Sequence, residues 1–345
     1  IVALGLGYTG FERTLIRELS ATVPPKKQIK PSLPSFKNWG LLNSEGNAHI
    51  AAPEAWRIEK GSKNVLVAVI DTGIDAFHPD LKINVKHNGW DFVKNKPALT
   101  DEHGHGTHVA GIIGAVQNLR EGISGVAQSV SLMPIKYYSE SNSGTTNLKN
   151  TVKALNYAIE NGAKIINYSG GGPEFSEEEY LAMKKAEAKG ILVIAAAGNE
   201  RSNIDIVDNY YYPAAYRLPN IISVASIDIK GNLLASSNWG KKRVDVAAPG
   251  ENIYSTLPGG RYGYMSGTSQ ATAFVTGLAA LILSKNPNLS PAEVRHIIVS
   301  STDQLPGLKD KIMGGKLNAY RALMSLSKPH QDPVAFRLIA APGFE

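Results

Sequence analysis

The chain has 345 residues, of which 43% are hydrophobic and 19% are charged, so it is long and apolar enough to bury a large core. It contains no cysteine, which excludes thiol catalysis, disulfides and cysteine metal sites. The net charge is +6 without a long basic run, so we expect a mixed, solvated surface and no nucleic-acid partner.

The two ends of the chain differ in composition from the middle. Residues 1–45 contain a proline-rich stretch that disfavours regular structure, and we predict an N-terminal arm or linker, or the remnant of a pro-region. Residues 46–328 carry regular apolar patterns and form the predicted globular domain, whereas residues 329–345 form a tail with no predicted element. The apolar runs are shorter than the roughly 18 residues that a membrane span needs, so we predict no membrane span.

From residue 64 onward, short apolar runs alternate with helical patterns. The runs are rich in β-branched residues and apolar on both faces, which is typical of strands that are covered on both sides. They lie at residues 65–70, 131–137, 163–169, 191–197 and 221–226. Helices are predicted at residues 106–116, 147–162, 176–190, 270–285, 291–300 and 317–325. This order predicts an α/β fold: a three-layer, doubly wound, mostly parallel sheet with helices on both faces.

Four polar side chains stand at the ends of predicted elements. Ligands bind beyond the carboxyl ends of the strands in open α/β sheets. Asp71 follows the first apolar run, and Asn199 follows the run at 191–197. His105 enters a glycine- and alanine-rich helix, and Ser269 stands at the start of a later helix. We therefore expect these four side chains at one edge of the sheet.

These residue types form an acyl-transfer set. Ser269 would attack a carbonyl carbon, His105 would take its proton and return it to the leaving group, and Asp71 would hold the imidazole in the correct tautomer. Asn199 would donate a hydrogen bond to the developing oxyanion, together with the backbone N–H of Ser269. Taken alone, Ser269 also fits a helix cap whose side chain satisfies an orphan N–H.

The segments around these residues resemble the signature blocks of the subtilisin-like serine proteases, the subtilases. They read VAVIDTGID, HGTHVAGIIG, AAAGNE and SGTSQATAFVTG, and they stand in the order Asp, His, Asn, Ser. The resemblance implies the subtilisin-like fold and a serine endopeptidase acting on proteins or peptides. It also implies a monomer, secreted or periplasmic, with its own pro-region as an inhibitor.

The resemblance extends to segments that bind substrate in subtilases. Residues 169–172 resemble an edge that pairs with the substrate backbone and borders the pocket for the residue before the cleaved bond, and residues 195–198 resemble the other wall of that pocket. Residues 142–144 resemble a second edge flanking the peptide. The implied substrate-binding residues are Ser143, Gly144, Ser169, Gly170, Gly171, Ala196 and Gly198. Subtilases commonly carry a bulkier residue at Gly170, so we expect a more open rim here.

Two further features leave alternatives open. Glu200 follows the oxyanion Asn and would line the substrate pocket, favouring a basic substrate side chain, or it is an exposed loop acid. The three tyrosines at 210–212 form an aromatic substrate wall or pack within their loop.

The nucleophile block departs from the usual subtilase pattern, in which Met follows the Ser and a Pro-His pair lies one turn later. This chain has Gln270, Ala273 and Phe274 at those positions. None of the four catalytic groups is replaced, so we retain the protease prediction. The rival interpretation is a catalytically silent protein that binds an extended peptide in the same cleft.

Calcium is implied by the resemblance alone. Asp80 matches an acidic ligand shortly after the catalytic Asp, and Asn118 begins a loop that binds a structural calcium ion in many subtilases. An Arg follows at position 120, which is unfavourable in a cation site, so a surface loop with a solvated charge pair is the alternative.

Other motifs are weak. The pattern G-x-G-x-x-G at residues 5–10 is not followed by a strand ending in an acid, so we predict no organic cofactor. The triplet at residues 71–73 has no second copy, as an aspartic protease would need. His103, His105 and His108 lack the spacing of a zinc protease.

Overall fold

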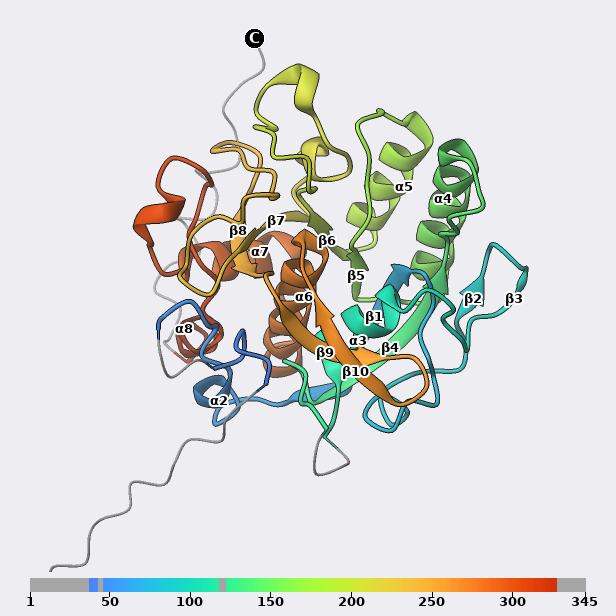
Figure 1. The fold of residues 1–345 in the computed structure, drawn as a ribbon, viewed down its shortest axis with the longest axis horizontal. Coiled ribbons are helices and arrows are strands. Elements are labelled where there is room, and N and C mark those ends of the chain that lie inside the picture. The colour runs from blue at the N-terminus through green and yellow to red at the C-terminus, as the bar shows by residue number, and fades with distance from the viewer. Residues whose placement is uncertain (1–36, 43–45, 118–121, 328–345) are drawn as a thin grey trace, which may run out of the picture. The chain divides into compact units, whose positions relative to one another are not determined.

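An eight-stranded sheet in the order β3-β2-β4-β1-β5-β6-β7-β8 lies at the centre of the fold (Figure 1). The computed structural model describes residues 37–42, 46–117 and 122–327. The β2–β3 pair is antiparallel and the other pairs are parallel, which confirms the predicted doubly wound sheet. The strands are β1 (Gly61–Asp71), β2 (Trp90–Asp91), β3 (Lys96–Pro97), β4 (Ser129–Lys136), β5 (Ile165–Tyr168), β6 (Leu192–Ala196), β7 (Ile221–Ile227) and β8 (Val246–Pro249).

The central strands are apolar on both faces because each face belongs to a different core. In β1, Val67 and Val69 pack into one hydrophobic cluster, whereas Ala68 and Ile70 pack into the other. Successive side chains of a strand point to opposite faces, so an uninterrupted apolar run fills both cores.

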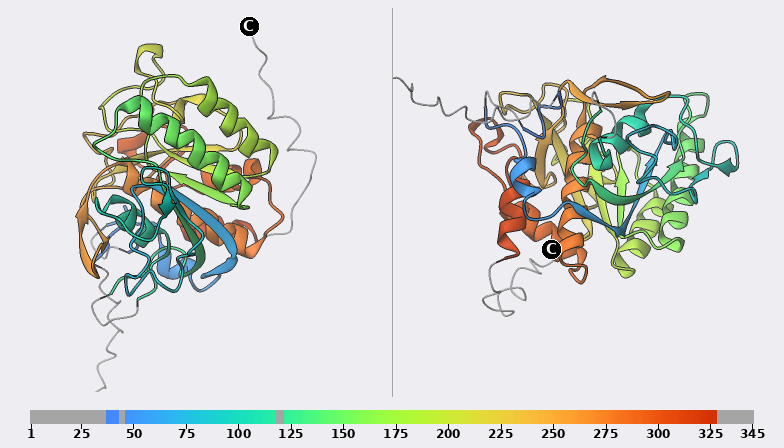
Figure 2. Two further views of the ribbon diagram at one scale, coloured as in Figure 1. Left: turned by 90° about the vertical axis from the view of Figure 1, so that its right-hand side faces the viewer. Right: turned by 90° about the horizontal axis from the view of Figure 1, so that it is seen from below.

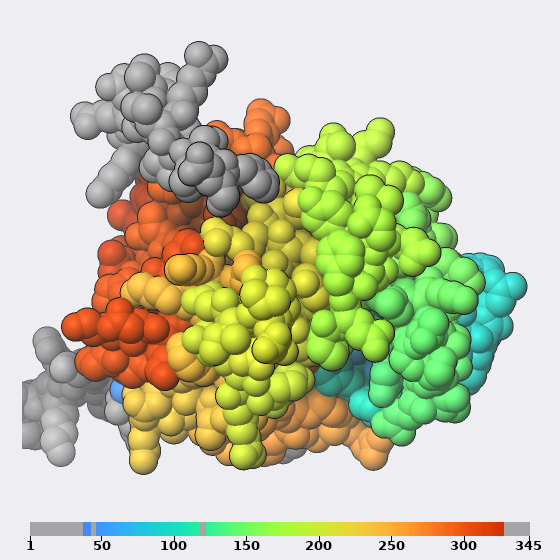
Figure 3. Space-filling model, turned by 90° about the horizontal axis from the view of Figure 1, so that it is seen from above, coloured from blue at the N-terminus to red at the C-terminus, as the bar shows by residue number. Residues whose placement is uncertain are grey.

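Helices cover both faces of the sheet (Figure 2). α3 and α6 contact each other on one face, and α6 is buried from Thr268 to Leu283. α4 and α5 lie side by side on the other face, where Figure 3 shows them as neighbours. The helices are α2 (Ala52–Ala55), α3 (His105–Gly114), α4 (Gly144–Glu160), α5 (Glu177–Ala188), α6 (Thr268–Lys285), α7 (Pro291–Ser300) and α8 (Ala319–Ser325).

Helix caps explain where several helices begin. Ser176 accepts a hydrogen bond from the N–H of Glu179, and Ser290 forms a reciprocal capping box with Glu293. α6 starts at Thr268, two residues earlier than predicted, and its N-cap is Gly267. Ser269 therefore lies inside the first turn, and the interpretation of this residue as a cap is wrong.

Two small β elements were not expected from the sequence. β9 (Ile253–Leu257) and β10 (Arg261–Met265) form an antiparallel hairpin that leads into α6, and β2 and β3 form a short one at the sheet edge. Short strands of this kind lack the long apolar runs by which the central strands are recognised.

The termini carry predictions that the structure covers only in part. Residues 1–36, 43–45 and 328–345 lie outside the described residues, so most of the predicted arm, the motif at 5–10 and the predicted tail do too. Within residues 37–42, Leu41 is buried in the core cluster that includes α6. No helix in the described part of the chain is long and apolar enough to cross a membrane.

Candidate active site

Three parallel strands end at the same level and place the predicted site there. β1 ends at Asp71, β5 at Tyr168 and β6 at Ala196. The register pairs Ile70 with Tyr168 and Tyr168 with Ala195, so side chains just beyond these ends share one edge of the sheet.

Asp71 and His105 form a short hydrogen bond at this edge. Nδ1 of His105 lies 2.7 Å from Oδ1 of Asp71, and Asp71 is only 3% exposed. Burial lowers the pKa of His105, but the charges of Asp71 and Asp101 outweigh it, so the pKa stands above its ordinary value. The bond fixes Nδ1 as the protonated nitrogen and leaves Nε2 to act as a base.

Asp101 holds the loop before His105 and was not singled out from the sequence. Its carboxylate accepts hydrogen bonds from the Thr72 hydroxyl at 2.9 Å, from the Gly104 N–H at 2.8 Å and from the Thr107 N–H at 2.9 Å. The signal was an Asp shortly before a helix start, where carboxylates commonly bind free N–H groups.

Ser269 lies in the first turn of α6 and is 8% exposed. Its Oγ donates a 3.0 Å hydrogen bond to the carbonyl of Ser169, and the Ser169 hydroxyl donates one of 3.3 Å to the carbonyl of Ser269. Asp71, His105 and Ser269 line one pocket of about 180 Å³. Catalytic hydrogen bonds are often long in the absence of substrate and tighten only when it binds.

The side chain of Asn199 is held through its amide oxygen to Thr268, the residue before Ser269. Its Oδ1 accepts hydrogen bonds from the N–H of Thr268 at 3.0 Å and from the Thr268 hydroxyl at 3.3 Å. The side-chain N–H₂ remains available as a donor. The N–H of Ser269, at the N-terminus of α6, has no acceptor within the helix, so the two donors can serve one oxyanion.

The expected opening at Gly170 is filled by a tyrosine. A Cβ added to Gly170 would lie 2.0 Å from the hydroxyl oxygen of Tyr137. The hydroxyl of Tyr137, which directly follows β4, therefore takes the space that a larger side chain at Gly170 would need.

Tyr211 lies between the two predicted walls of the neighbouring substrate pocket. A Cβ at Gly171 would lie 2.5 Å from Cε1 of Tyr211, and a Cβ at Gly198 would lie 3.0 Å from its Cδ2. Tyr211 therefore narrows the space between these glycines. Ala196, from the second wall, is buried at the end of β6.

Glu200 is hydrogen-bonded to Asn238, which lies in the segment between β7 and β8. Its Oε2 accepts a 2.6 Å hydrogen bond from the side chain of Asn238, which also accepts the Glu200 N–H. Ser143, on the second predicted edge, is the N-cap of α4 and accepts the N–H of Thr146. Glu200 is exposed, but a Cβ added to Gly198 would lie 2.4 Å from its Oε2, so the carboxylate also adjoins the second predicted wall and both interpretations of Glu200 stay predictions.

Asp80, the predicted calcium ligand, is buried and accepts hydrogen bonds from two described residues. Oδ2 of Asp80 accepts hydrogen bonds from the N–H of Ile123 at 2.8 Å and from the hydroxyl of Tyr262 at 2.9 Å, and these donors compete with a cation for the same oxygen. Asn118 lies outside the described residues. No group of three or more His, Cys, Asp or Glu side chains able to hold a metal occurs among the residues that the structure describes.

His108 is a structural histidine. Its Nε2 lies 3.0 Å from the carbonyl of Ile253, on β9, and burial lowers the pKa of His108 to about 4. The imidazole is therefore neutral and ties α3 to the hairpin of β9 and β10.

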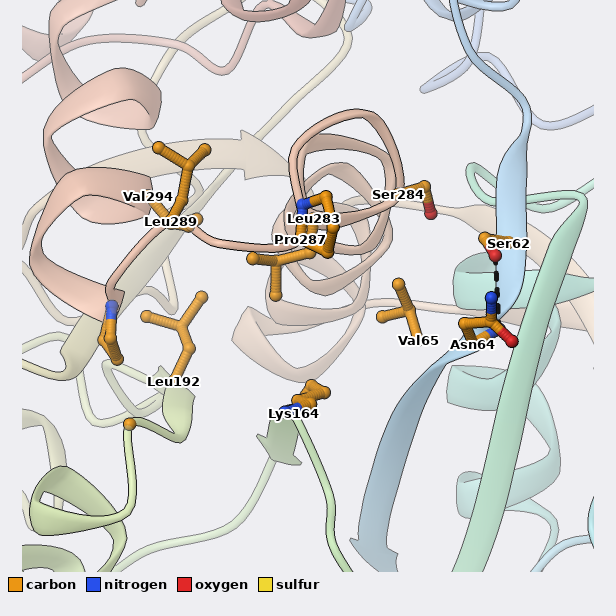
Figure 4. A pocket seen from close by; sticks show the side chains of 12 residues that line it. Ser62, Asn64, Val65, Lys164, Leu192, Leu283, Ser284, Pro287, Leu289 and Val294 are labelled. Carbon is orange, nitrogen blue, oxygen red and sulfur yellow. Dashed lines mark hydrogen bonds between the residues drawn. The ribbon is translucent and has the colours of Figure 1, made fainter.

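A second pocket, of about 150 Å³, lies at the opposite edge of the sheet, where β5 and β6 begin (Figure 4). Its labelled side chains are mostly apolar and include Val65, Leu192 and Leu283. Lys164 is the one ionisable residue among those that line it. Among the residues that line this pocket there is therefore no Asp–His pair like that of the first site.

Comparison with known proteins places this geometry in a family. The model of the "Subtilase family" matches residues 62–320. Thermitase from Thermoactinomyces vulgaris is 40% identical over 81% of this chain and 95% of its own length, and the major intracellular serine protease of Bacillus subtilis is 42% identical over 70% of this chain and 75% of its own. A solved structure of proteases from Pseudoalteromonas arctica is 27% identical, with a TM-score of 0.72 over 85% of this chain and 98% of that one. The chain therefore belongs to the subtilase family and is a serine endopeptidase.

Proposed function

We propose that Ser269, His105 and Asp71 are the catalytic triad of this endopeptidase and that Asn199 is its oxyanion donor. The observation that carries the proposal is the 2.7 Å bond between His105 and Asp71 in a pocket that Ser269 also lines. The orientation of Asn199, fixed through Thr268, supports its role.

The geometry supports a two-step reaction. Ser269 Oγ attacks the substrate carbonyl carbon while His105 Nε2 takes the hydroxyl proton, and Asp71 stabilises the resulting imidazolium. The oxyanion accepts hydrogen bonds from Asn199 and from the Ser269 N–H. His105 then gives its proton to the leaving amine, which leaves an acyl group on Ser269. Water, deprotonated by His105, attacks this ester, and His105 returns the proton to Ser269 Oγ as the acid leaves.

Substitution of Ser269 tests the assignment. Ser269→Ala should abolish peptide hydrolysis and labelling by a fluorophosphonate, because only an activated serine forms the adduct. Ser266→Ala is the matched control, since Ser266 is exposed and lies three positions earlier. If Ser269→Ala still cleaves peptides at the wild-type rate, the assignment is wrong.

The substrate is a protein or peptide, and we propose that it lies extended between residues 142–144 and 169–172. The substrate-binding residues Ser143, Gly144, Ser169, Gly170, Gly171, Ala196 and Gly198 remain predictions. The placement of Tyr211 supports a small side chain before the cleaved bond.

Calcium at Asp80 and Asn118 stays a prediction, and the hydrogen bonds of Asp80 argue against it. Thermal unfolding in calcium and in EDTA tests it. If Asp80 serves only as an acceptor for Ile123 and Tyr262, the two melting temperatures will agree. A higher melting temperature in calcium that Asp80→Asn abolishes would establish a site.

Location, assembly and domain limits also stay predictions. Secretion or a periplasmic location, a monomeric state and inhibition by a pro-region come from the family resemblance, whereas two relatives are named as intracellular proteases. The division into residues 1–45, 46–328 and 329–345 likewise remains a proposal. Mass determination of the N-terminus after isolation from the native source would test whether residues 1–45 stay attached.

A further inference from the structure

A larger cavity adjoins the catalytic pocket and shares Tyr137 and Tyr138 with it. Its volume is about 490 Å³, which is in the range of pockets that bind ligands. Gly144 lines it on one side, and Gly171 and Gly172 line it on the other. These glycines lie on the two edges proposed to flank the peptide. Because side chains alternate along an extended chain, a bound peptide would direct some of them toward this cavity.

The lining of the cavity suits a cation. Within the described residues, it contains carboxylates and tyrosine rings but no Lys, Arg or His. The carboxylates are those of Glu174, which is exposed, and Glu179, which is 2% exposed. The tyrosines are Tyr137, Tyr138, Tyr168 and Tyr212. Aromatic faces attract ammonium and guanidinium groups, so the rings and the carboxylates favour the same kind of ligand.

Glu179 is the unusual member of this lining. It lies in the first turn of α5, where its neighbours Glu177 and Glu178 are exposed, whereas Glu179 is buried. Its Oε2 accepts a 2.8 Å hydrogen bond from the hydroxyl of Tyr216, and Tyr168 also hydrogen-bonds to its carboxylate. Tyrosine hydroxyls satisfy the oxygens but bring no positive charge, so no cation among the described residues balances this buried carboxylate.

We propose that this cavity is a substrate subsite for a Lys or Arg side chain and that Glu179 is the residue that selects the charge. The inference rests on the proposed function, since it needs a peptide bound between the two edges. The ammonium or guanidinium group would supply the counter-ion that Glu179 lacks, and Tyr137 and Tyr168 would pack against the stem of the side chain. Glu174 would attract the cation at the cavity mouth.

The protonation of Glu179 gives the subsite a pH signature. Burial raises the pKa of Glu179 to about 7. The groups that face it are the hydroxyls of Tyr137, Tyr168, Tyr211 and Tyr216, and all four have raised pKa values, so they stay neutral. The carboxylate is charged above its pKa, so the preference for a cation should be present at pH 8 and be lost as the pH falls through 7.

Position-scanned peptides test the proposal. Internally quenched peptides carry Lys, norleucine or Glu at one position at a time, and kcat/KM is measured from pH 5.5 to 8.5. Norleucine has the Lys chain without its amine. At one position we expect Lys to exceed norleucine by about 10- to 100-fold at high pH, as a charge-assisted hydrogen bond supplies, and Glu to be the poorest. The Lys-to-norleucine ratio cancels the titration of His105, which acts on both substrates.

Variants assign the effect to Glu179. Glu179→Gln keeps the shape of the side chain and should bring the ratio close to one at every pH. Glu178→Gln, on the exposed side of the same helix, removes an equal charge and should leave the ratio unchanged. Tyr216→Phe removes a donor that lowers the pKa of Glu179, so the ratio should rise only at higher pH. This last variant provides a readout if Glu179→Gln does not fold.

The negative results of these experiments distinguish failure of the subsite from failure of the proposed function. If norleucine equals Lys at every position in an enzyme that cleaves peptides and reacts with a fluorophosphonate, the subsite is refuted and the triad stands. A Lys preference that survives in Glu179→Gln also refutes the role of Glu179. If no peptide is cleaved and Ser269 is not labelled, the proposed function fails and this inference fails with it.

Discussion

Replacing Asn199 with alanine tests whether its side chain stabilises the oxyanion. The Asn199 Oδ1 is held by the N–H and hydroxyl of Thr268 at 3.0 and 3.3 Å, so the N–H₂ is the group left for substrate. Losing one such donor lowers kcat by about 10²- to 10³-fold, or about 2.7 to 4 kcal/mol. We expect KM to change little, because the donor acts on charge that develops only in the transition state.

The same substitution has a separate effect on stability. Asn199→Ala removes the acceptor for the first N–H of α6, which should lower the free energy of unfolding by about 1 kcal/mol. Asn199→Asp keeps this acceptor and removes only the donor, so kcat should fall at least as far with a smaller loss of stability. Thr268→Val removes the hydroxyl bond alone and should leave kcat near that of the wild type.

Steady-state kinetics on one peptide and urea denaturation of the same preparations separate the two effects. If Asn199→Ala lowers the free energy of unfolding but keeps kcat within about threefold, the side chain serves only to hold the start of α6, and the oxyanion role is refuted. A rise in KM with unchanged kcat would instead mean that Asn199 binds the ground state.

Three other substitutions test the charge, packing and pocket arguments. Asp71→Asn should lower the plateau of kcat/KM in the pH profile by about 10⁴-fold. It should also move the acid limb of the profile to lower pH, because the charge of Asp71 holds the pKa of His105 above 6.5 against the effect of burial. An acid limb that does not move would contradict this explanation. Gln270→Met should raise the free energy of unfolding, measured by urea denaturation, by about 1 kcal/mol. The reason is that the buried Nε2 of Gln270 has no hydrogen-bond partner among the described residues. A loss of stability would contradict this packing argument. Tyr211→Ala should widen the pocket for the residue before the cleaved bond. The ratio of kcat/KM for a peptide with Phe at that position to kcat/KM for one with Ala should therefore rise by about tenfold or more, and an unchanged ratio would show that Tyr211 lies outside the pocket.

The sheet could be predicted from the sequence because a strand that is buried on both faces consists of an uninterrupted run of apolar residues. The run at residues 65–70 is uninterrupted because Val67 and Ala68 face different cores. The cap residues Ser176 and Ser290 mark helix starts for an equally local reason. The start of α6 was misplaced because its N-cap, Gly267, has no capping side chain to recognise.

The substrate side of the site could not be predicted in the same way. The hydroxyl of Tyr137 fills the space at Gly170, although 33 positions separate them in the chain and no local pattern links them. Glu179 looked like one of three similar acids at a helix start, and only the packing of α5 shows which of them is buried. Contacts of this kind depend on tertiary structure, which periodicity does not report.

This difference follows from what each part of the site must do. Acyl transfer requires a nucleophile, a base and oxyanion donors in one fixed arrangement, so these groups stand at strand ends and helix starts, where the backbone sets their positions. Substrate side chains are met by residues from loops and helix faces, such as Tyr211 and Glu179, which can change without moving Asp71 or Ser269. Subsite variants should therefore redirect cleavage while the enzyme still reacts with a fluorophosphonate, because the reactivity of Ser269 depends on His105 and not on the subsites.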